Sequence, residues 1–125
     1  MILDHSSSPR RSVLVVDPSA ENREVLRTVL AQRGLRIWEA DEAHAGVELA
    51  RKHHPDVIVL DDEATSAGCA EACDQLSAEV HCQQSSLVIL GKLRRGESLP
   101  PAQVLSKPYH FAPLVHTIER LAKAA

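Results

Sequence analysis

The sequence predicts a single α/β domain in which the strands of a parallel sheet alternate with amphipathic helices. Short, continuous apolar runs are typical of strands that are buried on both faces of such a sheet. Three of them occur, at residues 13–16, 57–60 and 87–90. Segments with a helical apolar period separate these runs, and strands that alternate with helices form right-handed βαβ units. A chain of 125 residues is one ordinary domain, and its 44% of hydrophobic residues is enough to build a core.

The composition argues against several classes of function. The formal net charge is −3, and the chain has one Trp, one Tyr and one Phe, so we expect neither a basic face nor an aromatic platform for nucleic acid. No apolar run approaches the roughly 20 residues that span a bilayer. Residues 1–11 lack the apolar core of a secretory signal and are expected to be a flexible leader to a domain at residues 12–125. Three cysteines, an odd number, fit a reducing compartment, so we expect a cytoplasmic domain that binds neither nucleic acid nor membrane.

Two helices and a strand are predicted between the first two apolar runs. The first helix begins after Ser19, a suitable N-cap, and stops before Gly34. One face of this helix consists of Asn22, Val25, Leu26, Val29 and Leu30. A second strand is predicted at residues 35–40, and a second helix runs from about residue 43 to residue 54, where Pro55 ends it.

The second half of the chain continues the alternation, with one irregular unit. A third helix is predicted at residues 68–80, and a short fifth strand at residues 104–105 precedes the last helix. The last helix begins near Pro113 and has one apolar face: Phe111, Leu114, Val115, Ile118 and Leu121. The segment between the fourth and fifth strands contains three residues that disfavour a helix: Gly96, Pro100 and Pro101. We therefore expect the fourth helix to be shortened or absent.

Charged residues follow three of the predicted strands at the point where each strand ends. Asp17, Asp61 and Lys107 follow the first, third and fifth strands. Because ligands of such sheets bind at the carboxyl ends of the strands, we expect these side chains to lie together. Two carboxylates can hold a divalent cation, and a phosphoryl group fits between that cation and an ammonium group. Taken alone, Asp61 could instead cap a loop and Lys107 could be a surface lysine. The Lys107–Pro108 bond is a candidate for the cis form.

Four short segments carry a recognisable pattern: VLVVD at 13–17, ENRE at 21–24, PDVIVLD at 55–61 and SKPY at 106–109. Together they resemble the receiver domain of two-component response regulators, the fold of the chemotaxis-type receivers. The resemblance runs from residue 12 to residue 122. It implies a flavodoxin-like, doubly wound parallel sheet of five strands in the order 2-1-3-4-5.

The resemblance also implies a role for each residue of this cluster. Asp61 would be the phosphoacceptor, Lys107 the pocket lysine, and Asp17 one member of the acidic pair of the family. The backbone carbonyl of Glu63 would join Asp17 and Asp61 as a ligand of Mg²⁺. The phosphoryl donor would be a sensor histidine kinase or a phosphotransfer protein.

Several positions depart from the pattern of the family. Pro18 stands in place of the second acid, which is the more direct metal ligand, and Gly91 stands in place of the hydroxyl residue at the end of the fourth strand. Lys92 replaces a small residue, Val104 replaces the aromatic switch residue, and the loop at 64–68 lacks the usual Met-Pro and Asp-Gly pairs. The chain therefore resembles a degenerate receiver, in which Mg²⁺ binding is weak or absent.

Other polar residues near the predicted site allow more than one interpretation. Asp62 is expected to point away from Asp61, because neighbouring residues of an extended chain face opposite sides. Glu63 returns to the Asp61 side, where its carboxylate either approaches a metal or is simply solvated. A second group superficially resembles a zinc site but is spread along too much helix to converge on one ion: Cys69, Cys73, His81 and Cys82.

Three functions remain after this comparison, and the first is preferred. The first is a receiver module that accepts a phosphoryl group on Asp61 within a phosphorelay. The second is a pseudo-receiver of the same fold, to which partners bind without phosphorylation. The third, an aspartyl-phosphate phosphatase of the haloacid dehalogenase type, needs a second Asp two residues after the nucleophile, where this chain has Glu63. We therefore expect a signalling module and not an enzyme.

Overall fold

Five parallel strands form one sheet in the order β2-β1-β3-β4-β5 in the computed structural model, which describes residues 11–65, 75–76, 78–79, 85–91 and 102–124. The strands are β1 (Ser12–Val16), β2 (Arg36–Ala40), β3 (Val57–Asp61), β4 (Ser86–Leu90) and β5 (Ala102–Leu105). The helices are α1 (Ala20–Gln32), α2 (Ala43–His53) and α4 (Phe111–Ala124), and a short 3₁₀ helix, η2 (Asp62–Thr65), follows β3. The predicted fold class and strand order are confirmed.

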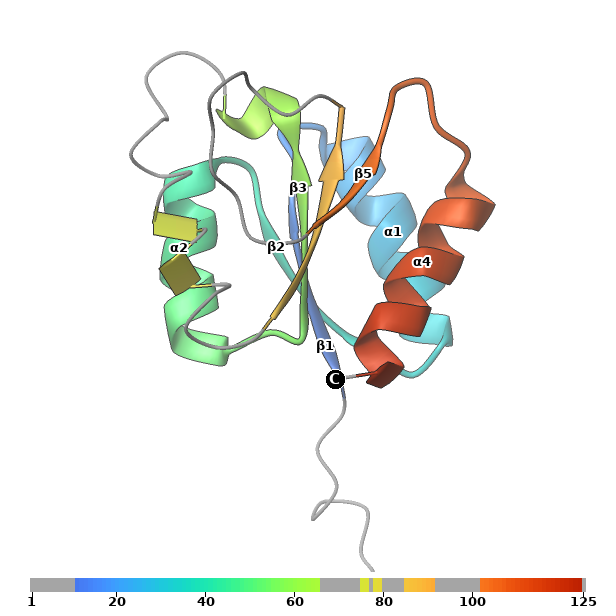
Figure 1. The fold of residues 1–125 in the computed structure, drawn as a ribbon, viewed down its shortest axis with the longest axis horizontal. Coiled ribbons are helices and arrows are strands. Elements are labelled where there is room, and N and C mark those ends of the chain that lie inside the picture. Colours follow the sequence, from blue (N-terminus) through green and yellow to red (C-terminus); the bar gives the residue numbers. More distant parts are fainter. Residues whose placement is uncertain (1–10, 66–74, 77, 80–84, 92–101, 125) are drawn as a thin grey trace, which may run out of the picture.

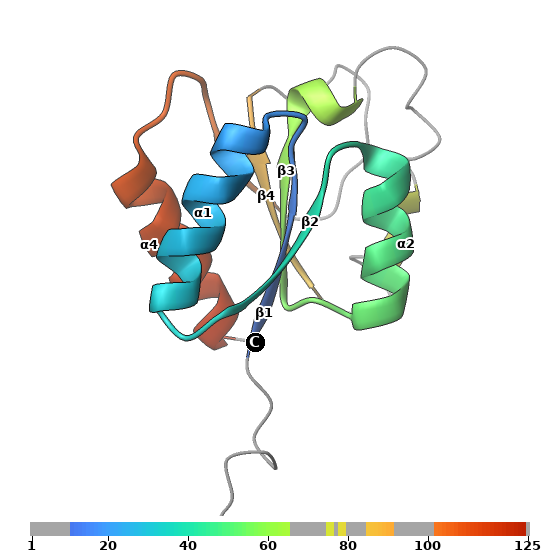
Figure 2. The same cartoon turned by 180° about the vertical axis from the view of Figure 1, so that it is seen from behind.

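Helices cover both faces of the sheet. Helices α1 and α4 lie side by side on one face and α2 lies on the other, as the two opposite views show (Figures 1 and 2). Alternate residues of β1, β3 and β4 contribute to the two cores, so that Val13 and Val15 pack with α1 and α4 while Leu14 and Val16 pack with α2. Burial on both faces explains why β1, β3 and β4 are continuous apolar runs.

Local signals set the ends of the helices as predicted. The Ser19 hydroxyl oxygen accepts a hydrogen bond from the Asn22 backbone N–H at 3.2 Å and caps α1. Gly34 follows that helix with a φ of +83°, the left-handed conformation in which glycine is favoured. Helix α2 ends at His53, two residues before Pro55. On α1 the buried residues are Leu26 and Leu30, whereas Val25 is 41% exposed, so the apolar face is narrower than predicted.

Element boundaries differ from the prediction by small amounts. Strand β5 begins at Ala102, two residues earlier than predicted, and α4 begins at Phe111, two residues before Pro113. The leader, most of the helix predicted at 68–80 and the predicted irregularity at residues 96–101 lie outside the described residues; the four described positions 75, 76, 78 and 79 are helical.

The carboxyl ends of the strands meet at one edge of the sheet, which is the upper edge in Figure 1. Helix η2 and the connection from β5 to α4 lie at this edge, so the residues that follow β1, β3, β4 and β5 are brought close together. Within the part of the chain that the structure describes, no helix has the length and apolar character needed to cross a membrane.

Candidate functional site

Asp61 lies at the centre of the predicted site, at the last position of β3. It is only 1% exposed, because the strands β1 and β4 flank β3 on both sides. Its Oδ1 atom accepts two hydrogen bonds, one from Lys107 Nζ at 2.9 Å and one from the Glu63 backbone N–H at 2.8 Å. These contacts fix the orientation of the carboxylate, with Oδ1 held by donors.

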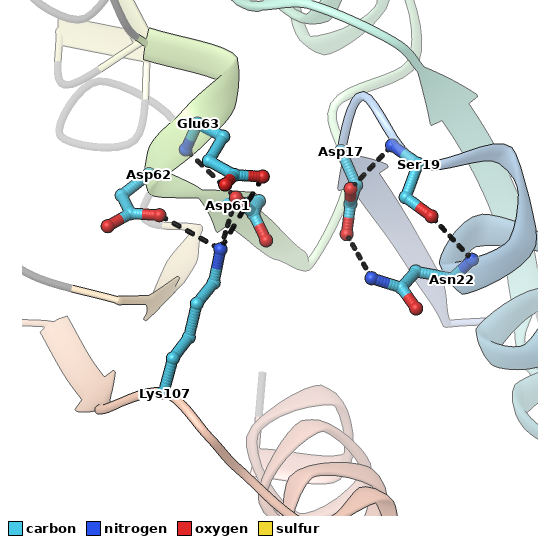
Figure 3. A network of polar contacts seen from close by, with 7 residues as sticks. All are labelled: Asp17, Ser19, Asn22, Asp61, Asp62, Glu63 and Lys107. Atoms are coloured by element: carbon cyan, nitrogen blue, oxygen red, sulfur yellow. Dashed lines mark hydrogen bonds and ion pairs between the residues drawn. The ribbon is translucent and has the colours of Figure 1, made fainter.

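Asp17 follows β1 and is also buried, with 2% exposure. Its Oδ1 accepts a hydrogen bond from the Ser19 N–H at 2.8 Å, and its Oδ2 lies 3.5 Å from Asn22 Nδ2. Figure 3 shows Asp17 and Asp62 on opposite sides of Asp61. Burial raises the pKa of the Asp17 carboxyl group; the hydrogen bond from Ser19 opposes this rise and the negative charge of Asp61 adds to it.

Lys107 reaches from the end of β5 to three acidic side chains (Figure 3). Its Nζ atom lies 2.9 Å from Asp61 Oδ1, 3.1 Å from Asp62 Oδ1 and 3.8 Å from Glu63 Oε2. Burial alone would lower the pKa of Lys107, but hydrogen bonds to Asp61 and Asp62 outweigh it, and the pKa is raised above its ordinary value. Lys107 is therefore a permanent cation at this edge. The Lys107–Pro108 bond is cis, as predicted.

The prediction that Asp62 points away from Asp61 is wrong. That prediction assumed that the extended chain continues past Asp61, but β3 ends there and Asp62 is the first residue of η2. The turn of the 3₁₀ helix brings the Asp62 carboxylate to the same ammonium group that contacts Asp61. Glu63 also faces Lys107, but its side chain is 73% exposed and extends into solvent.

Gly91 directly follows β4 and has a φ of +117°, a conformation that residues with side chains rarely adopt. A Cβ atom built on Gly91 would overlap the carboxylate of Asp62. The space that a side chain at position 91 would need is thus filled by the side chain of Asp62. The resemblance to the family identifies Gly91 as a departure, but it does not identify Asp62 as the residue that fills the space beside it.

The donor set for a divalent cation contains two buried carboxylates. The negative charge of Asp61 adds to the rise in the pKa of Asp17, and a cation between the two carboxylates would relieve that repulsion. The side chain of Glu63 does not join them, because it extends toward Lys107 and solvent. Among the described residues, no group of three or more His, Cys, Asp or Glu side chains is arranged to hold a metal ion. Asp17 and Asp61 are thus the two carboxylates of the predicted Mg²⁺ site, in which the Glu63 carbonyl is the third predicted ligand.

Sequence reasoning missed two residues that hold the site in place. Ser19 and Asn22 were interpreted only as parts of α1, yet both donate hydrogen bonds to Asp17. The signal was present, because Asn22 is the one polar residue on the predicted apolar face of that helix. An open depression of about 540 Å³ lies beside the site and is lined by Asn22, Lys107, Pro108, Tyr109 and Phe111.

Of three other features noted in the sequence, the structure describes one. Val104, at the position of the aromatic switch residue, is 41% exposed on β5. Lys92 lies outside the described residues, as do the cysteine and histidine positions considered for zinc.

Comparison with known proteins identifies the family. The family model of the response regulator receiver domain matches residues 13–119. The chain belongs to the response regulator receiver domain family. Receiver domains act in two-component phosphorelay systems, are generally signalling modules without enzymatic activity of their own, and typically bind Mg²⁺. A comparison with curated protein sequences found no match.

Solved structures of receivers share the fold at low sequence identity. Chemotaxis protein CheY4 of Vibrio cholerae is 20% identical, with a TM-score of 0.71 over 90% of this chain and 99% of that one. A CheY-like receiver domain protein of Methanospirillum hungatei is 14% identical, with a TM-score of 0.74 over 93% and 96%. The receiver domain of the hybrid histidine kinase CckA is 15% identical, with a TM-score of 0.69 over 89% and 98%. The likeness covers nearly the whole of each receiver.

Proposed function

We propose that this receiver accepts a phosphoryl group on Asp61 from a phosphohistidine of a sensor histidine kinase or a phosphotransfer protein. The observation that carries the proposal is the placement of the Asp61 carboxylate, which is buried at a strand end between the ammonium of Lys107 and the carboxylate of Asp17. Two hydrogen bonds engage Oδ1, so Oδ2 is the atom assigned to attack.

The transfer exchanges one bond to phosphorus for another. Oδ2 of Asp61 forms a bond to the phosphorus atom while the bond from phosphorus to the imidazole nitrogen of the donor breaks. The electron pair of that bond stays on the imidazole, and the product on this chain is an acyl phosphate. Lys107 stabilises the transition state, because its charge lies next to the carboxylate that receives the phosphoryl group.

Asp17 and Asp61, with the backbone carbonyl of Glu63, would hold Mg²⁺ in this scheme. When bound, the metal supplies positive charge to the phosphoryl oxygens. Pro18 supplies no carboxylate, so the site has one anionic ligand fewer than the acidic pair of the family provides. Weak metal binding and slow phosphorylation by small donors follow from this loss.

The partners of the exchange follow from the family. The likeness to the receiver of the hybrid histidine kinase CckA supports a histidine kinase as the donor class. The three cysteines are consistent with a cytoplasmic location for the exchange.

Phosphoramidate tests this proposal, because it contains the same kind of P–N bond as phosphohistidine. The unaltered protein and the Asp61→Asn variant are incubated with the donor and with Mg²⁺ at about 10 mM, and the intact masses are followed with time. We expect slow addition of one phosphoryl group to the unaltered protein and none to Asp61→Asn. Lys107→Ala should slow the addition about tenfold or more, since it removes a charge at the reacting group.

Lys52→Ala is the matched control, because Lys52 is an exposed lysine at the opposite edge of the sheet, near the end of α2. It should leave the rate unchanged. Absence of any Asp61-dependent addition, with this donor and with acetyl phosphate, would contradict the proposal and leave the phosphorylation-independent pseudo-receiver as the function.

A further inference from the structure

Asp62 and Gly91 form a pair of residues that fit each other at the edge of the site. The Asp62 carboxylate occupies the space next to the Gly91 Cα atom where any side chain at position 91 would begin. Asp62 is on η2 and Gly91 follows β4, so the contact joins two separate segments of the chain. A carboxylate therefore lies in the place from which a side chain at the end of β4 would reach into the site.

This carboxylate is bound to the cation that a phosphoryl group needs. Lys107 Nζ is 2.9 Å from Asp61 Oδ1 and 3.1 Å from Asp62 Oδ1, so the two acids share the ammonium at nearly equal distances. The side chain of Lys107 is 34% exposed, and the Glu63 carboxylate lies farther from the ammonium than the other two acids, at 3.8 Å. A phosphoryl group on Asp61 adds negative charge at the same place and would need the same donor.

We propose that Asp62 competes with the incoming phosphoryl group for Lys107 and thereby restrains phosphorylation of Asp61. This inference rests on the proposed function of Asp61. In the unmodified domain the Asp62 carboxylate holds Lys107 in place of a phosphoryl oxygen. For Lys107 to bind the phosphoryl group, Asp62 has to move away from its contacts with Lys107 and Gly91. Asp62 is thus a residue that regulates the site and takes no part in bond formation.

A set of charge variants tests the competition by the rate of Asp61 phosphorylation. Asp62→Asn keeps the shape of the side chain and removes its charge, and Asp62→Ala removes both. With phosphoramidate and Mg²⁺, intact masses should show Asp61-dependent labelling about tenfold faster in both variants than in the unaltered protein. Asp41→Asn is the matched control, because Asp41 is an exposed acid that follows β2 at the same edge of the sheet. It should change the rate less than twofold.

Asp62→Asn combined with Lys107→Met distinguishes competition for the ammonium from general repulsion between Asp62 and the phosphoryl donor. If Asp62 acts by occupying Lys107, Asp62→Asn does not accelerate phosphorylation of Asp61 once the ammonium is absent. Because Lys107→Met itself slows the reaction, the two rates are compared over longer incubations. An equal acceleration in both backgrounds would overturn the proposal, because the effect would then be simple repulsion of the donor. Melting temperatures of all variants report whether each one is folded.

The outcomes distinguish this inference from the proposed function. Equal labelling of the unaltered protein and both Asp62 variants would overturn the competition and leave Asp61 as the phosphoacceptor. Absence of Asp61-dependent labelling in every variant would overturn both. Acceleration in the Asp62 variants alone, dependent on Lys107, is the result that we expect.

Discussion

Single residues at the strand ends determine the charge balance of the site. One ammonium, Lys107, faces Asp61, Asp62 and Glu63, and Asp17 lies close enough to Asp61 for their charges to interact. Carboxylates therefore outnumber the cation among these residues. Two of these carboxylates, those of Asp17 and Asp61, are buried, and this buried negative charge is unfavourable for folding and favourable for binding a divalent cation.

The protonation of Asp17 should make stability depend on pH. Because burial raises the pKa of Asp17, the free energy of unfolding falls as the pH rises from the ordinary aspartate value of 3.8 through the higher value of the folded protein. Asp17→Asn removes this loss. Without metal, we expect the variant to be more stable than the unaltered protein near neutral pH and no more stable at about pH 3. Urea unfolding across this range measures the difference, and a variant that is destabilised equally at every pH would contradict the expectation.

The contact between Gly91 and Asp62 predicts a coupled effect on stability. Gly91→Ala places a Cβ atom against the Asp62 carboxylate in a backbone conformation that disfavours side chains, so we expect a loss of about 2–3 kcal/mol. In combination with Asp62→Ala the steric part disappears while the backbone strain remains. The double variant should therefore recover about 1 kcal/mol relative to additivity. Chemical denaturation of the unaltered protein, the two single variants and the double variant gives the four free energies of unfolding for this double-mutant cycle. Strictly additive losses would show that Gly91 and Asp62 do not touch.

Helices and strands bring residues that are distant in the sequence to a single edge. Burial of β1 and β3 on both faces fixes their register, and the ends of these strands carry Asp17 and Asp61. The Ser19 cap fixes the start of α1 close to Asp17. The rigid part of the site is thus built from the ends of regular elements.

Close packing of α2 against the sheet depends on Gly46. A Cβ atom on Gly46 would lie 2.8 Å from Val16 Cγ2, which is closer than side chains tolerate. Alanine is the better helix former by about 1 kcal/mol, but overpacking costs about 1–3 kcal/mol, so Gly46→Ala should be net destabilising by about 1 kcal/mol. With Val16→Ala present, the same substitution should become neutral or stabilising. Melting temperatures from thermal unfolding test this expectation. Glu48→Ala, which changes an exposed residue of the same helix, is the control. Stabilisation by Gly46→Ala in the presence of Val16 would contradict the expectation.

Most of the fold could be predicted because its signals are local. The apolar runs of β1 and β3 and the cap at Ser19 each depend on neighbouring residues only. The positions of Asp61 and Lys107 were predictable as well, because both stand at strand ends that must meet in a parallel sheet.

The contacts of Asp62 could not be predicted from the sequence. Whether it continues a strand or begins a 3₁₀ helix depends on the packing of η2, and the alternation of an extended chain suggested the wrong side. Its contact with Gly91 joins segments that are remote in the sequence and leaves no periodic signal. Gly91 was recognisable as an unusual residue, but the reason for the missing side chain required the three-dimensional arrangement.

The whole chain carries a formal net charge of −3, and the proposed metal site contains two buried carboxylates, Asp17 and Asp61. Metal binding stabilises the folded state by mass action, so the stability of the entire molecule reports on the site. The receiver sheet has its five strands, and the departures from the family concern the site, the neighbouring loops and Val104 on β5.

Mg²⁺ should therefore raise the melting temperature of the unaltered protein only slightly. Pro18→Asp restores an acid next to Asp17 and should increase the rise, whereas Pro18→Ala, the control for loss of the proline ring, should not. Thermal unfolding at Mg²⁺ concentrations up to about 10 mM, with K⁺ at matched ionic strength, measures the effect. An equally large rise in the unaltered protein and in Pro18→Asp would mean that Pro18 does not limit metal binding.

The phosphoacceptor itself is tested most directly by locating the modified residue, because Asp61, Asp62 and Glu63 are adjacent and an intact mass does not distinguish them. Borohydride reduction of the phosphorylated protein converts an aspartyl phosphate to homoserine, and fragmentation of the peptide then shows which residue has changed. We predict homoserine at position 61 only, since Asp61 alone of the three is buried beside both Lys107 and Asp17. Reduction at position 62 or 63, with position 61 unchanged, would contradict the assignment of Asp61.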